Sequence, residues 1–234
     1  MSRLFLVRHG QSVWNLQNRF TGWVDVSLSS QGVIEAQRAA ALLAEEHFDV
    51  AFTSTLLRAQ HSLYEILRQN RHCTQYVCVH EQDSDWYGHR IQAESDAHEL
   101  KIFISNKINE RYYGDLQGLN KDWAIQRYGA EKVHLWRRSY DVPPPNGESL
   151  KMTAARTLPY YRERIVPYLQ RGDSVLVAAH GNSLRSIIMH IEQMSPQQII
   201  DYELGTGAPL MYEFDDDVRI IEKAHFCNAD RTGT

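Results

Sequence analysis

The sequence predicts an α/β protein: a three-layer sandwich in which helices cover both faces of a mostly parallel central sheet. Strand-like and helix-like stretches alternate along the chain, an order typical of parallel sheets with covering helices. The apolar runs Arg3–Val7 and Ser174–Ala179 have the composition of buried strands. No repeat, low-complexity tract or linker interrupts the 234 residues, so we expect one domain over residues 1–234.

The first half of the chain contains three of the expected strands and two of the expected helices. A serine can cap the first helix, and Gly10 lets the backbone turn after the first strand. The stretch Glu81–Glu99 is polar and has no clear period, which favours a loop. We expect strands at Arg3–Val7, Asp49–Ser54 and Gln75–Val79, and helices from Ser29 or Ser30 to about Glu46 and over Leu56–Gln69.

The second half has clearer boundaries. Pro159 should kink or split a long helix, and Ser195 begins a capping box with proline at the first helical position. Three aspartates, Asp215–Asp217, indicate a hairpin turn. We expect helices over Asn120–Tyr128, Glu131–Arg138, Ser149 to about Gln170, Leu184–Gln193 and after Ser195, and strands at Ser174–Ala179, Leu210–Phe214 and Val218–Ala224.

Composition excludes several classes of protein. Apolar residues make up 43% of the chain and charged residues 23%, as in ordinary globular proteins. The formal net charge of -4 argues against nucleic-acid binding. The longest apolar run, Ala39–Ala44, is too short to span a membrane, and no secretory segment opens the chain. Three cysteines (Cys73, Cys78, Cys227) do not suggest a disulfide framework, so we expect a soluble cytoplasmic protein.

Two histidines stand at the ends of two predicted strands. His9 and His180 each precede a glycine and then a helix. Ligands bind beyond the carboxyl ends of strands in open α/β sheets, and helix N-termini there favour anions. If the strands are neighbours, the pair suits phosphoryl transfer, with one imidazole as nucleophile and the other stabilising charge. The alternatives are packed strand-end histidines, or a metal site, which the adjacent Arg8 disfavours.

Other residues at the strand ends can bind an anion. Arg8 adjoins His9, and Arg58 begins the helix after the second strand. Asn15, Thr21 and Gly22 lie in the segment after the first strand and can donate hydrogen bonds. Each could instead be an ordinary solvated residue, but their gathering at strand ends favours an anion site.

Longer motifs surround these residues and span nearly the whole chain. They occupy Leu6–Asn15, Asn18–Ser29, Asn109–Lys121, Trp136–Arg138, Pro143–Ser149, Ala178–Arg185, Gly205–Leu210 and Tyr212–Phe214. These motifs resemble the histidine phosphatase superfamily and, within it, the cofactor-dependent phosphoglycerate mutases. A bare Arg-His-Gly is only suggestive, whereas the extended run as far as Ser29 is specific to the mutase branch.

The resemblance implies a phosphoglycerate mutase-like fold and a glycolytic activity, shared with gluconeogenesis. That activity interconverts 3-phosphoglycerate and 2-phosphoglycerate through a phosphohistidine. It is primed by 2,3-bisphosphoglycerate and needs no metal. The implied partners are small-molecule phosphoglycerates and further copies of the chain, in a homodimer or homotetramer.

The resemblance also implies residue roles. His9 corresponds to the phosphate acceptor, Glu110 to the general acid and base, and His180 to the group that stabilises the moving phosphoryl. The residues that correspond to ligands of the phosphoryl oxygens are Arg8, Asn15, Arg58 and Asn182. The other implied substrate-binding residues are Thr21, Gly22, Tyr113, Lys121, Arg137, Arg138 and Gly181.

The charge of the implied ligand suits these motifs. A bisphosphoglycerate carries about −4 to −5, from two phosphates and a carboxylate. The motifs offer six cations in or beside them, namely Arg8, Arg58, Arg111, Lys121, Arg137 and Arg138. Loops that exclude water would suppress hydrolysis of a phosphohistidine, and the candidate lids are Tyr112–Lys121 and the tail from about Asn228.

The chain departs from the family pattern in three places. An insertion is expected around residues 72–99 and should loop outward. Within it Cys73, Cys78 and His80 could hold zinc, although strand and loop roles are the simpler interpretation. Tyr112 stands where the family often has histidine, and a short tail after Asn228 could permit more phosphatase side activity.

Two other functions stay open. A phosphatase of the same superfamily would share His9, Arg8, Arg58 and His180 without needing Lys121 or the arginine pair. A non-catalytic phospho-ligand binding protein is disfavoured, because all the implied catalytic residues are present. Neither a G-x-G-x-x-G motif nor a P-loop occurs, so dinucleotide and nucleotide binding find no support.

Overall fold

The computed structural model describes residues 1–79 and 99–226. Seven strands form one sheet in the order β3-β4-β2-β5-β1-β6-β7. The five strands from β3 to β1 are parallel, and β6 and β7 run antiparallel at one edge, which confirms the mostly parallel prediction. The strands are β1 (Ser2–Arg8), β2 (Val50–Thr53), β3 (Gln75–Val79), β4 (Glu99–Ile104), β5 (Ser174–Ala179), β6 (Pro209–Phe214) and β7 (Ile220–His225).

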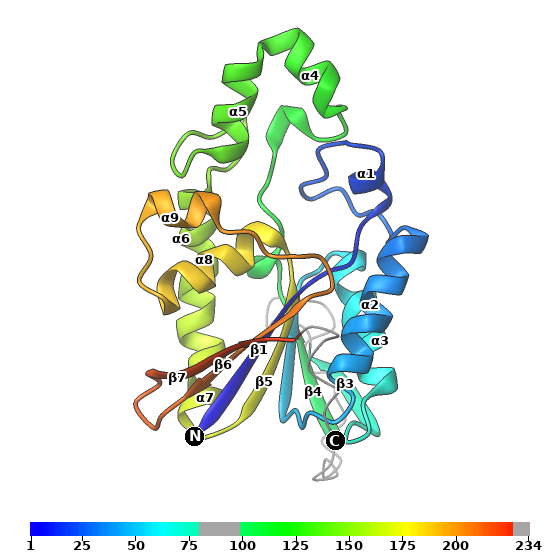
Figure 1. Ribbon diagram of the computed structural model, residues 1–234, viewed down its shortest axis with the longest axis vertical. Helices are drawn as coiled ribbons and strands as arrows, with labels where there is room; N and C mark the ends of the chain where they lie inside the picture. The colour runs from blue at the N-terminus through cyan, green and yellow to red at the C-terminus, as the bar shows by residue number, and fades with distance from the viewer. Residues whose placement is uncertain (80–98, 227–234) are drawn as a thin grey trace.

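Helices cover the two faces of this sheet. In Figure 1, α2 and α3 lie on one side of the strands, α6, α7 and α8 on the other, and α4 and α5 extend beyond the strand ends. The α-helices are α1 (Val13–Leu16), α2 (Ser30–Leu42), α3 (Leu57–Gln69), α4 (Lys121–Tyr128), α5 (Ala130–Arg138), α6 (Leu150–Tyr160), α7 (Val166–Gln170), α8 (Gly181–Ile191) and α9 (Pro196–Asp201). Shorter helical turns are η1 (Asn106–Ile108), η2 (Gly114–Leu116) and η3 (Tyr161–Ile165). The predicted three layers are confirmed.

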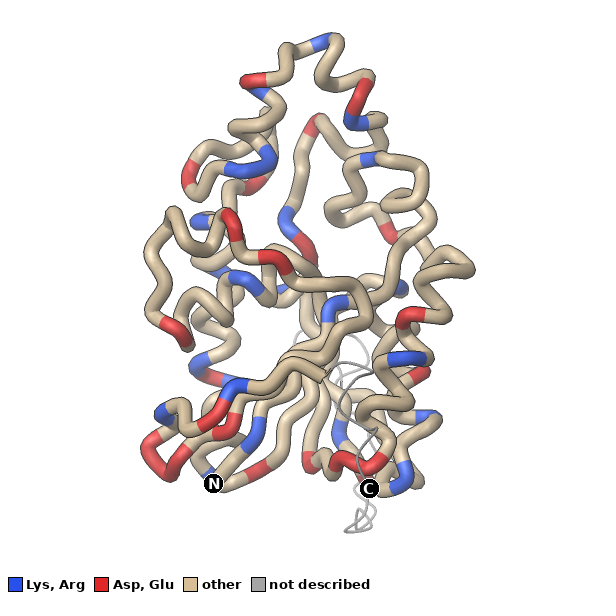
Figure 2. The backbone as a smooth tube through the Cα atoms, in the orientation of Figure 1, with Lys and Arg blue, Asp and Glu red and all other residues tan. Residues whose placement is uncertain are grey.

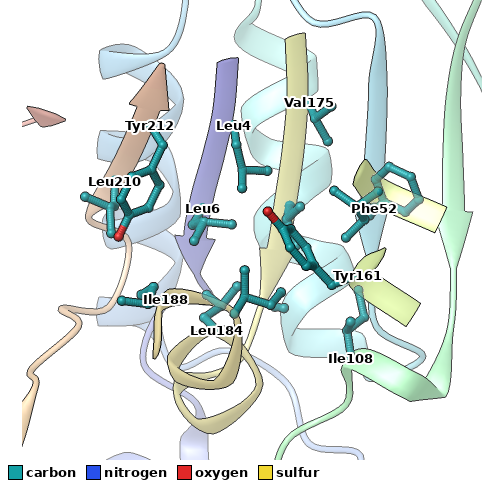
Figure 3. Close-up of a cluster of buried hydrophobic side chains, with 14 of the residues drawn as sticks. Leu4, Leu6, Phe52, Ile108, Tyr161, Val175, Leu184, Ile188, Leu210 and Tyr212 are labelled. Carbon is teal, nitrogen blue, oxygen red and sulfur yellow. The ribbon is translucent and has the colours of Figure 1, made fainter. Parts of the chain in front are cut away.

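The core alternates along β1 between the two faces of the sheet. Leu4 and Leu6 pack with α8 residues such as Leu184 in one buried cluster, drawn in Figure 3. Phe5 and Val7 face the opposite way and pack in a second cluster with α2 and α3. Successive side chains of a strand point to opposite faces, so a continuous apolar run fits a strand covered on both sides.

The long helix predicted from Ser149 is split near Pro159, as expected. Ser149 caps α6 by accepting from the backbone N–H of Met152 at 3.2 Å. A π-helical turn, η3, follows directly on α6, and α7 continues beyond it. Proline lacks the N–H of a regular helical turn, which accounts for the break.

Other predicted boundaries are wrong. The first long helix ends at Leu42 instead of about Glu46, because the side chain of Asn70 donates to the carbonyls of Leu43 and Glu46 at 2.9 and 2.8 Å. The helix expected over Leu184–Gln193 begins three residues earlier, directly after His180. Strand β4 was not predicted, and the loop expected over Glu81–Glu99 lies outside the described residues except for Glu99, which begins β4.

Gly10 serves a different purpose from the expected turn. Its φ is not in the left-handed region. A Cβ at this position would lie 2.1 Å from the carbonyl oxygen of Gly32, so glycine is required by a close approach of two backbones. That approach draws the start of α2 against the segment that follows β1, next to His9.

The register of the central strands sets up the site. β1 and β5 are parallel neighbours in which Arg8 pairs with Ala179. The next residue on each strand is a histidine, and the N–H of His9 donates to the carbonyl of Ala179 at 3.0 Å. Two residues that are 171 positions apart in sequence therefore leave the sheet side by side.

Candidate active site

The two strand-end histidines are in contact. The ring centroids of His9 and His180 lie 4.9 Å apart, with the planes inclined at 63°. His9 is 3% exposed and His180 is 0% exposed. The expectation that the two imidazoles come together from neighbouring strands is confirmed, although only His9 lines the cavity beyond the strand ends.

The hydrogen bonds of His9 select its tautomer. Its Nδ1 lies 2.6 Å from the carbonyl oxygen of Gly10, which can only accept, so Nδ1 carries the proton. Nε2 accepts from Nε of Arg58 at 3.3 Å and holds a lone pair. Burial and then the charges of Arg58 and Arg8 hold the pKa of His9 well below its usual range. His9 is therefore a neutral imidazole with a nucleophilic Nε2 at neutral pH.

His180 offers a complementary group. Its Nε2 lies 2.7 Å from Oγ of Ser54, which also accepts from the N–H of Leu56. Its Nδ1 is buried and has no hydrogen-bond partner among the described residues. Burial, followed by the charges of Arg58 and His9, lowers the pKa of His180 far below its usual value. An unpartnered buried nitrogen on a ring in contact with His9 is suited to a polar ligand atom.

Two arginines flank the pair. Arg58 is 0% exposed and donates to the carbonyls of Val24 and Gly22 at 3.0 and 2.7 Å. Burial lowers its pKa to about 10, which leaves it charged at neutral pH. Arg8 donates to the carbonyl of Leu204 at 2.8 Å, while its buried Nε has no partner among the described residues. Both guanidiniums are held in place by backbone contacts.

Glu110 brings a carboxylate to the same place. Its Oε1 accepts from the N–H of Arg111 at 2.7 Å and from the side chain and N–H of Asn182 at 2.8 and 3.3 Å. Its Oε2 has no hydrogen bond within the described residues and lies 3.8 Å from where a Cβ of Gly181 would be. One oxygen thus fixes the carboxylate, and the other is available for proton exchange.

These groups line a polar cavity of about 210 Å³ beyond the strand ends. Eight of its lining residues are Arg or Lys and two are Glu. Figure 2 shows basic positions on several segments between the sheet and the α4–α5 pair. The lining residues are Arg8, His9, Asn15, Arg19, Phe20, Thr21, Gly22, Arg58, Glu110, Arg111, Tyr113, Lys121, Arg137, Arg138, Gly181, Asn182, Arg185, Glu203 and Leu204.

Every substrate-binding residue that the sequence suggested lines this cavity. His180 does not, because it is fully buried against His9 and Ser54. Sequence reasoning gave no role to five lining residues: Arg19, Phe20, Arg185, Glu203 and Leu204. Arg185 carried a usable signal, since it lies four and three residues after Gly181 and Asn182 on one helix face.

The cations of the cavity repel one another. Burial and then the charge of Arg138 lower the pKa of Arg185. Burial and then the charge of Arg137 lower the pKa of Lys121. Arg138 is paired with Glu203 at 3.2 Å. An anion in the cavity would relieve this repulsion, so the site favours ligands of high negative charge.

A stacked pair forms another part of the wall. The guanidinium of Arg111 lies 4.7 Å from the ring centroid of Tyr113 and donates to its hydroxyl at 3.1 Å. Burial raises the pKa of Tyr113, but the charge and hydrogen bond of Arg111 outweigh it and the net pKa is lowered. Nε of Arg111 is buried without a partner among the described residues.

The segment Tyr112–Lys121, suggested as lid material, forms part of the cavity wall. Its first residue accepts at its carbonyl from the N–H of Glu148 at 2.7 Å. Its last donates from its N–H to the carbonyl of Asn18 at 2.8 Å. Both ends are thus hydrogen-bonded to other segments, and the lid role stays a prediction. The tail suggested as a second lid lies outside the described residues from residue 227 onward.

The described residues hold neither a cluster of metal ligands nor a helix that could span a membrane. Within residues 1–79 and 99–226, no three His, Cys, Asp or Glu side chains are grouped to hold a metal ion. Of the zinc ligands considered, Cys73 and Cys78 are partly buried, Cys78 lies 3.3 Å from the hydroxyl of Tyr64, and His80 is outside the described residues. No described helix has the length and apolar character to cross a membrane.

Sequence comparisons point to one family. The pattern of the histidine phosphatase superfamily (branch 1) matches residues 4–94 and 89–225. A 2,3-bisphosphoglycerate-dependent phosphoglycerate mutase of Pseudoalteromonas atlantica is 61% identical over 223 residues, which cover 95% of this chain and 98% of the relative. A phosphoglycerate mutase of Schizosaccharomyces pombe is 47% identical over 222 residues, covering 94% and 93%.

Solved structures share the fold at lower identity. A mycobacterial glucosyl-3-phosphoglycerate phosphatase complexed with VO3 superposes with a TM-score of 0.72 at 21% identity, covering 96% of this chain and 97% of that chain. An alpha-ribazole phosphatase from Shigella flexneri gives a TM-score of 0.70 at 21% identity, covering 93% and 95%. These likenesses concern the arrangement of the sheet and its helices.

Proposed function

The chain belongs to the histidine phosphatase superfamily, and from this we propose that it is a phosphoglycerate mutase. It interconverts 3-phosphoglycerate and 2-phosphoglycerate through a phosphohistidine on His9, and it depends on 2,3-bisphosphoglycerate as primer. The mutases that match it are 61% and 47% identical over nearly the full length of both chains.

One observation carries the chemistry of this proposal. The hydrogen bond from Nδ1–H of His9 to the carbonyl of Gly10 leaves the lone pair of the ring on Nε2. Among the Arg, Lys and Glu residues that line the surrounding cavity, eight are cations and two are anions. A neutral imidazole attacks phosphorus through its lone pair, and surrounding cations stabilise the phosphoryl oxygens as charge moves. The depressed pKa of His9 keeps that lone pair available.

In the proposed steps, His9 carries the phosphoryl group, Glu110 moves the proton, and three further residues hold the phosphoryl oxygens. His9, once phosphorylated by the primer, gives its phosphoryl to the free hydroxyl of the bound phosphoglycerate, and the bond from Nε2 to phosphorus breaks. Nε2 then attacks the phosphorus of the substrate's original ester, and the bond from that phosphorus to the ester oxygen breaks. Glu110, through Oε2, takes the proton of the attacking hydroxyl in the first transfer and gives it to the leaving oxygen in the second. His180 Nδ1 and the guanidiniums of Arg8 and Arg58 hold the phosphoryl oxygens during transfer. The isomerised phosphoglycerate then leaves and His9 is again phosphorylated, so the primer is needed only to load it.

The primer fits the groups that lack partners. Arg8 Nε, Arg111 Nε, Thr21 Oγ1 and His180 Nδ1 are buried without hydrogen bonds among the described residues. All but His180 belong to residues that line the cavity. Lys121 and the pair Arg137 and Arg138 would hold the carboxylate and the second phosphate. When bound, 2,3-bisphosphoglycerate supplies the phosphoryl group that loads His9, and no metal is required.

A phosphatase activity of the same superfamily is the second candidate. The solved structures with this fold include a glucosyl-3-phosphoglycerate phosphatase and an alpha-ribazole phosphatase, although at identities that support the fold alone. A mutase needs a wider cationic surface, because its ligand carries two phosphates and a carboxylate, and eight lining cations supply it.

One incubation separates the two activities. The protein is mixed with 3-phosphoglycerate and a catalytic amount of 2,3-bisphosphoglycerate, and the products are followed by phosphorus NMR. Appearance of 2-phosphoglycerate without stoichiometric inorganic phosphate supports the mutase. Release of phosphate without the 2-isomer would assign a phosphatase, and binding without either product would leave a phospho-ligand binding protein.

The proposal extends to cellular context. We place the activity in glycolysis and gluconeogenesis in the cytoplasm, on small-molecule phosphoglycerates and not on nucleic acid or membranes. The chain forms one catalytic domain over residues 1–234, with an insertion around residues 72–99, and it assembles as a homodimer or homotetramer. Light scattering on the purified protein measures the assembly, and a monomer at micromolar concentration would reject it.

A further inference from the structure

The main chain of Glu110 is held by two donors from distant parts of the sequence. Its carbonyl oxygen accepts from Nε1 of Trp23 at 2.5 Å and from Nη2 of Arg156 at 2.8 Å. The guanidinium of Arg156 also lies over the indole of Trp23, 5.4 Å from the ring centroid. Neither residue lines the cavity. These contacts set the position of the Glu110 backbone from outside the site.

Arg156 uses the rest of its guanidinium on the same segment. Its Nη1 donates to the carbonyls of Lys107 and Asn109 at 2.9 and 3.1 Å. Its Nε and Nη2 form a two-pronged pair with Glu148, each at 2.9 Å. The side chains of Arg156 and Glu148 are only 15% and 18% exposed, so this pair is not a solvated surface contact.

Glu148 also binds the main chain two residues after Glu110, at Tyr112. Its Oε2 accepts from the N–H of Tyr112 at 2.9 Å, and its own N–H donates to the carbonyl of Tyr112 at 2.7 Å. Burial raises the pKa of Glu148, but the hydrogen bonds from Arg156 and Tyr112 outweigh it and lower the net pKa. The carboxylate is therefore charged at neutral pH, and residues 107–112 are held on both sides of Glu110.

We propose that Arg156 is a positioning residue for the proton-transfer step, acting through the main chain of Glu110. The proposal rests on the proposed role of Glu110 as general acid and base. A proton donor must lie within hydrogen-bond reach of its target, and a shift of about 1 Å can cost about 100-fold in rate. His9, His180 and Arg58 have no hydrogen bond to Arg156 and should keep their phosphoryl-binding geometry when it is changed.

A double-mutant cycle with Glu110 tests this role. R156K keeps the positive charge, but a single ammonium cannot pair twice with Glu148 and also reach three carbonyls. We expect R156K to lower kcat for isomerisation by about 10- to 100-fold, with KM changed by less than about 3-fold. In an E110Q background the same change should lower kcat by less than about 3-fold, because the positioned carboxylate is already gone.

Controls separate positioning from general damage. R164K alters an exposed arginine further along the same helical stretch and should leave kcat within about 2-fold. W23F removes the other donor to the Glu110 carbonyl and should give the same pattern as R156K. The affinity for orthovanadate, a mimic of the transferring phosphoryl, should stay within about 3-fold in both variants.

The outcomes decide between distinct failures. An equal loss of kcat from R156K in the wild-type and E110Q backgrounds would overturn the positioning role, as would a parallel loss of orthovanadate affinity. If E110Q alone keeps near wild-type isomerisation, the proposed role of Glu110 fails instead. Loss confined to the background with Glu110 intact, and matched by W23F, supports the proposal.

Discussion

Arg58 donates from Nε to Nε2 of His9 across 3.3 Å, so a fixed positive charge faces the nitrogen that must stay unprotonated. A protonated imidazole would meet both this charge and a buried environment, and both effects oppose protonation. The same guanidinium is anchored by the carbonyls of Gly22 and Val24. A cation that suppresses protonation of His9 is thus also placed to hold a phosphoryl group on it.

The first prediction concerns the phosphoenzyme. H9A should abolish isomerisation and any acid-labile phosphoenzyme, because it removes the nitrogen that is proposed to carry the phosphoryl group. Incubation with 32P-labelled 2,3-bisphosphoglycerate, followed by gel analysis at alkaline pH, measures the label. H47N changes an exposed histidine outside the cavity and serves as the control that should still be labelled. Full turnover by H9A would remove the mechanism.

The second prediction concerns the charge beside His9. R58M removes the cation whose charge lowers the pKa of His9 the most. The pKa of His9 should therefore rise, while burial still keeps it below its usual value. NMR of 15N-labelled histidine across pH 4.5–8 follows the ring directly. R164M, remote from the site, should leave the titration unchanged. A His9 pKa that stays the same in R58M would mean that burial alone keeps the ring neutral.

The third prediction links these histidines to stability. In the unfolded chain a histidine has a pKa near ~6.5, and in the fold His9 and His180 titrate well below that. Below about pH 6.5 the unfolded chain therefore binds more protons than the folded chain. The contribution of these histidines to the free energy of unfolding is complete above this pH and decreases as the pH is lowered through it. The slope should reach about 1.4 kcal/mol per pH unit for each histidine.

Urea unfolding at pH 7.0, 6.0 and 5.5 measures that slope. H9N removes one of the two buried rings and should reduce the slope by up to about 1.4 kcal/mol per pH unit, provided that the variant folds by circular dichroism. H47N changes an exposed histidine and is the matched control, with the slope preserved. The same pH dependence in wild type and H9N would contradict the linkage.

The fourth prediction concerns a residue to which the motifs assigned no role. Arg185 lines the cavity, and burial together with Arg138 lowers its pKa. R185M should raise KM for 3-phosphoglycerate by about 10- to 100-fold, the scale of losing a charge-assisted hydrogen bond of about 1.5–3 kcal/mol. Steady-state kinetics measure it, with R219M on the distant β6–β7 turn as control. An unchanged KM would place Arg185 outside the ligand contacts.

The sequence predicted local features well. Continuous apolar character marked β1 and β5, Ser149 marked the start of α6, and Pro159 marked its end, because each signal depends on neighbours within a few residues. Strand β4 was missed, since its six residues follow a polar stretch and alternate in burial without a strong turn signal. The end of α2 was misplaced because the side chain that caps it, Asn70, comes from another helix's end.

The same distinction between local signals and long-range contacts applies to the active site. The sequence by itself determined the two histidine–glycine strand ends and the motif residues that line the cavity. Only the tertiary structure decided that β1 and β5 are neighbours, that Nδ1 of His9 meets Gly10, and that Arg156 reaches the main chain of Glu110. Helix capping and hydrophobic periodicity depend on residues within short stretches of the chain. Sheet order and side-chain contacts instead arise from packing between segments that are far apart in sequence.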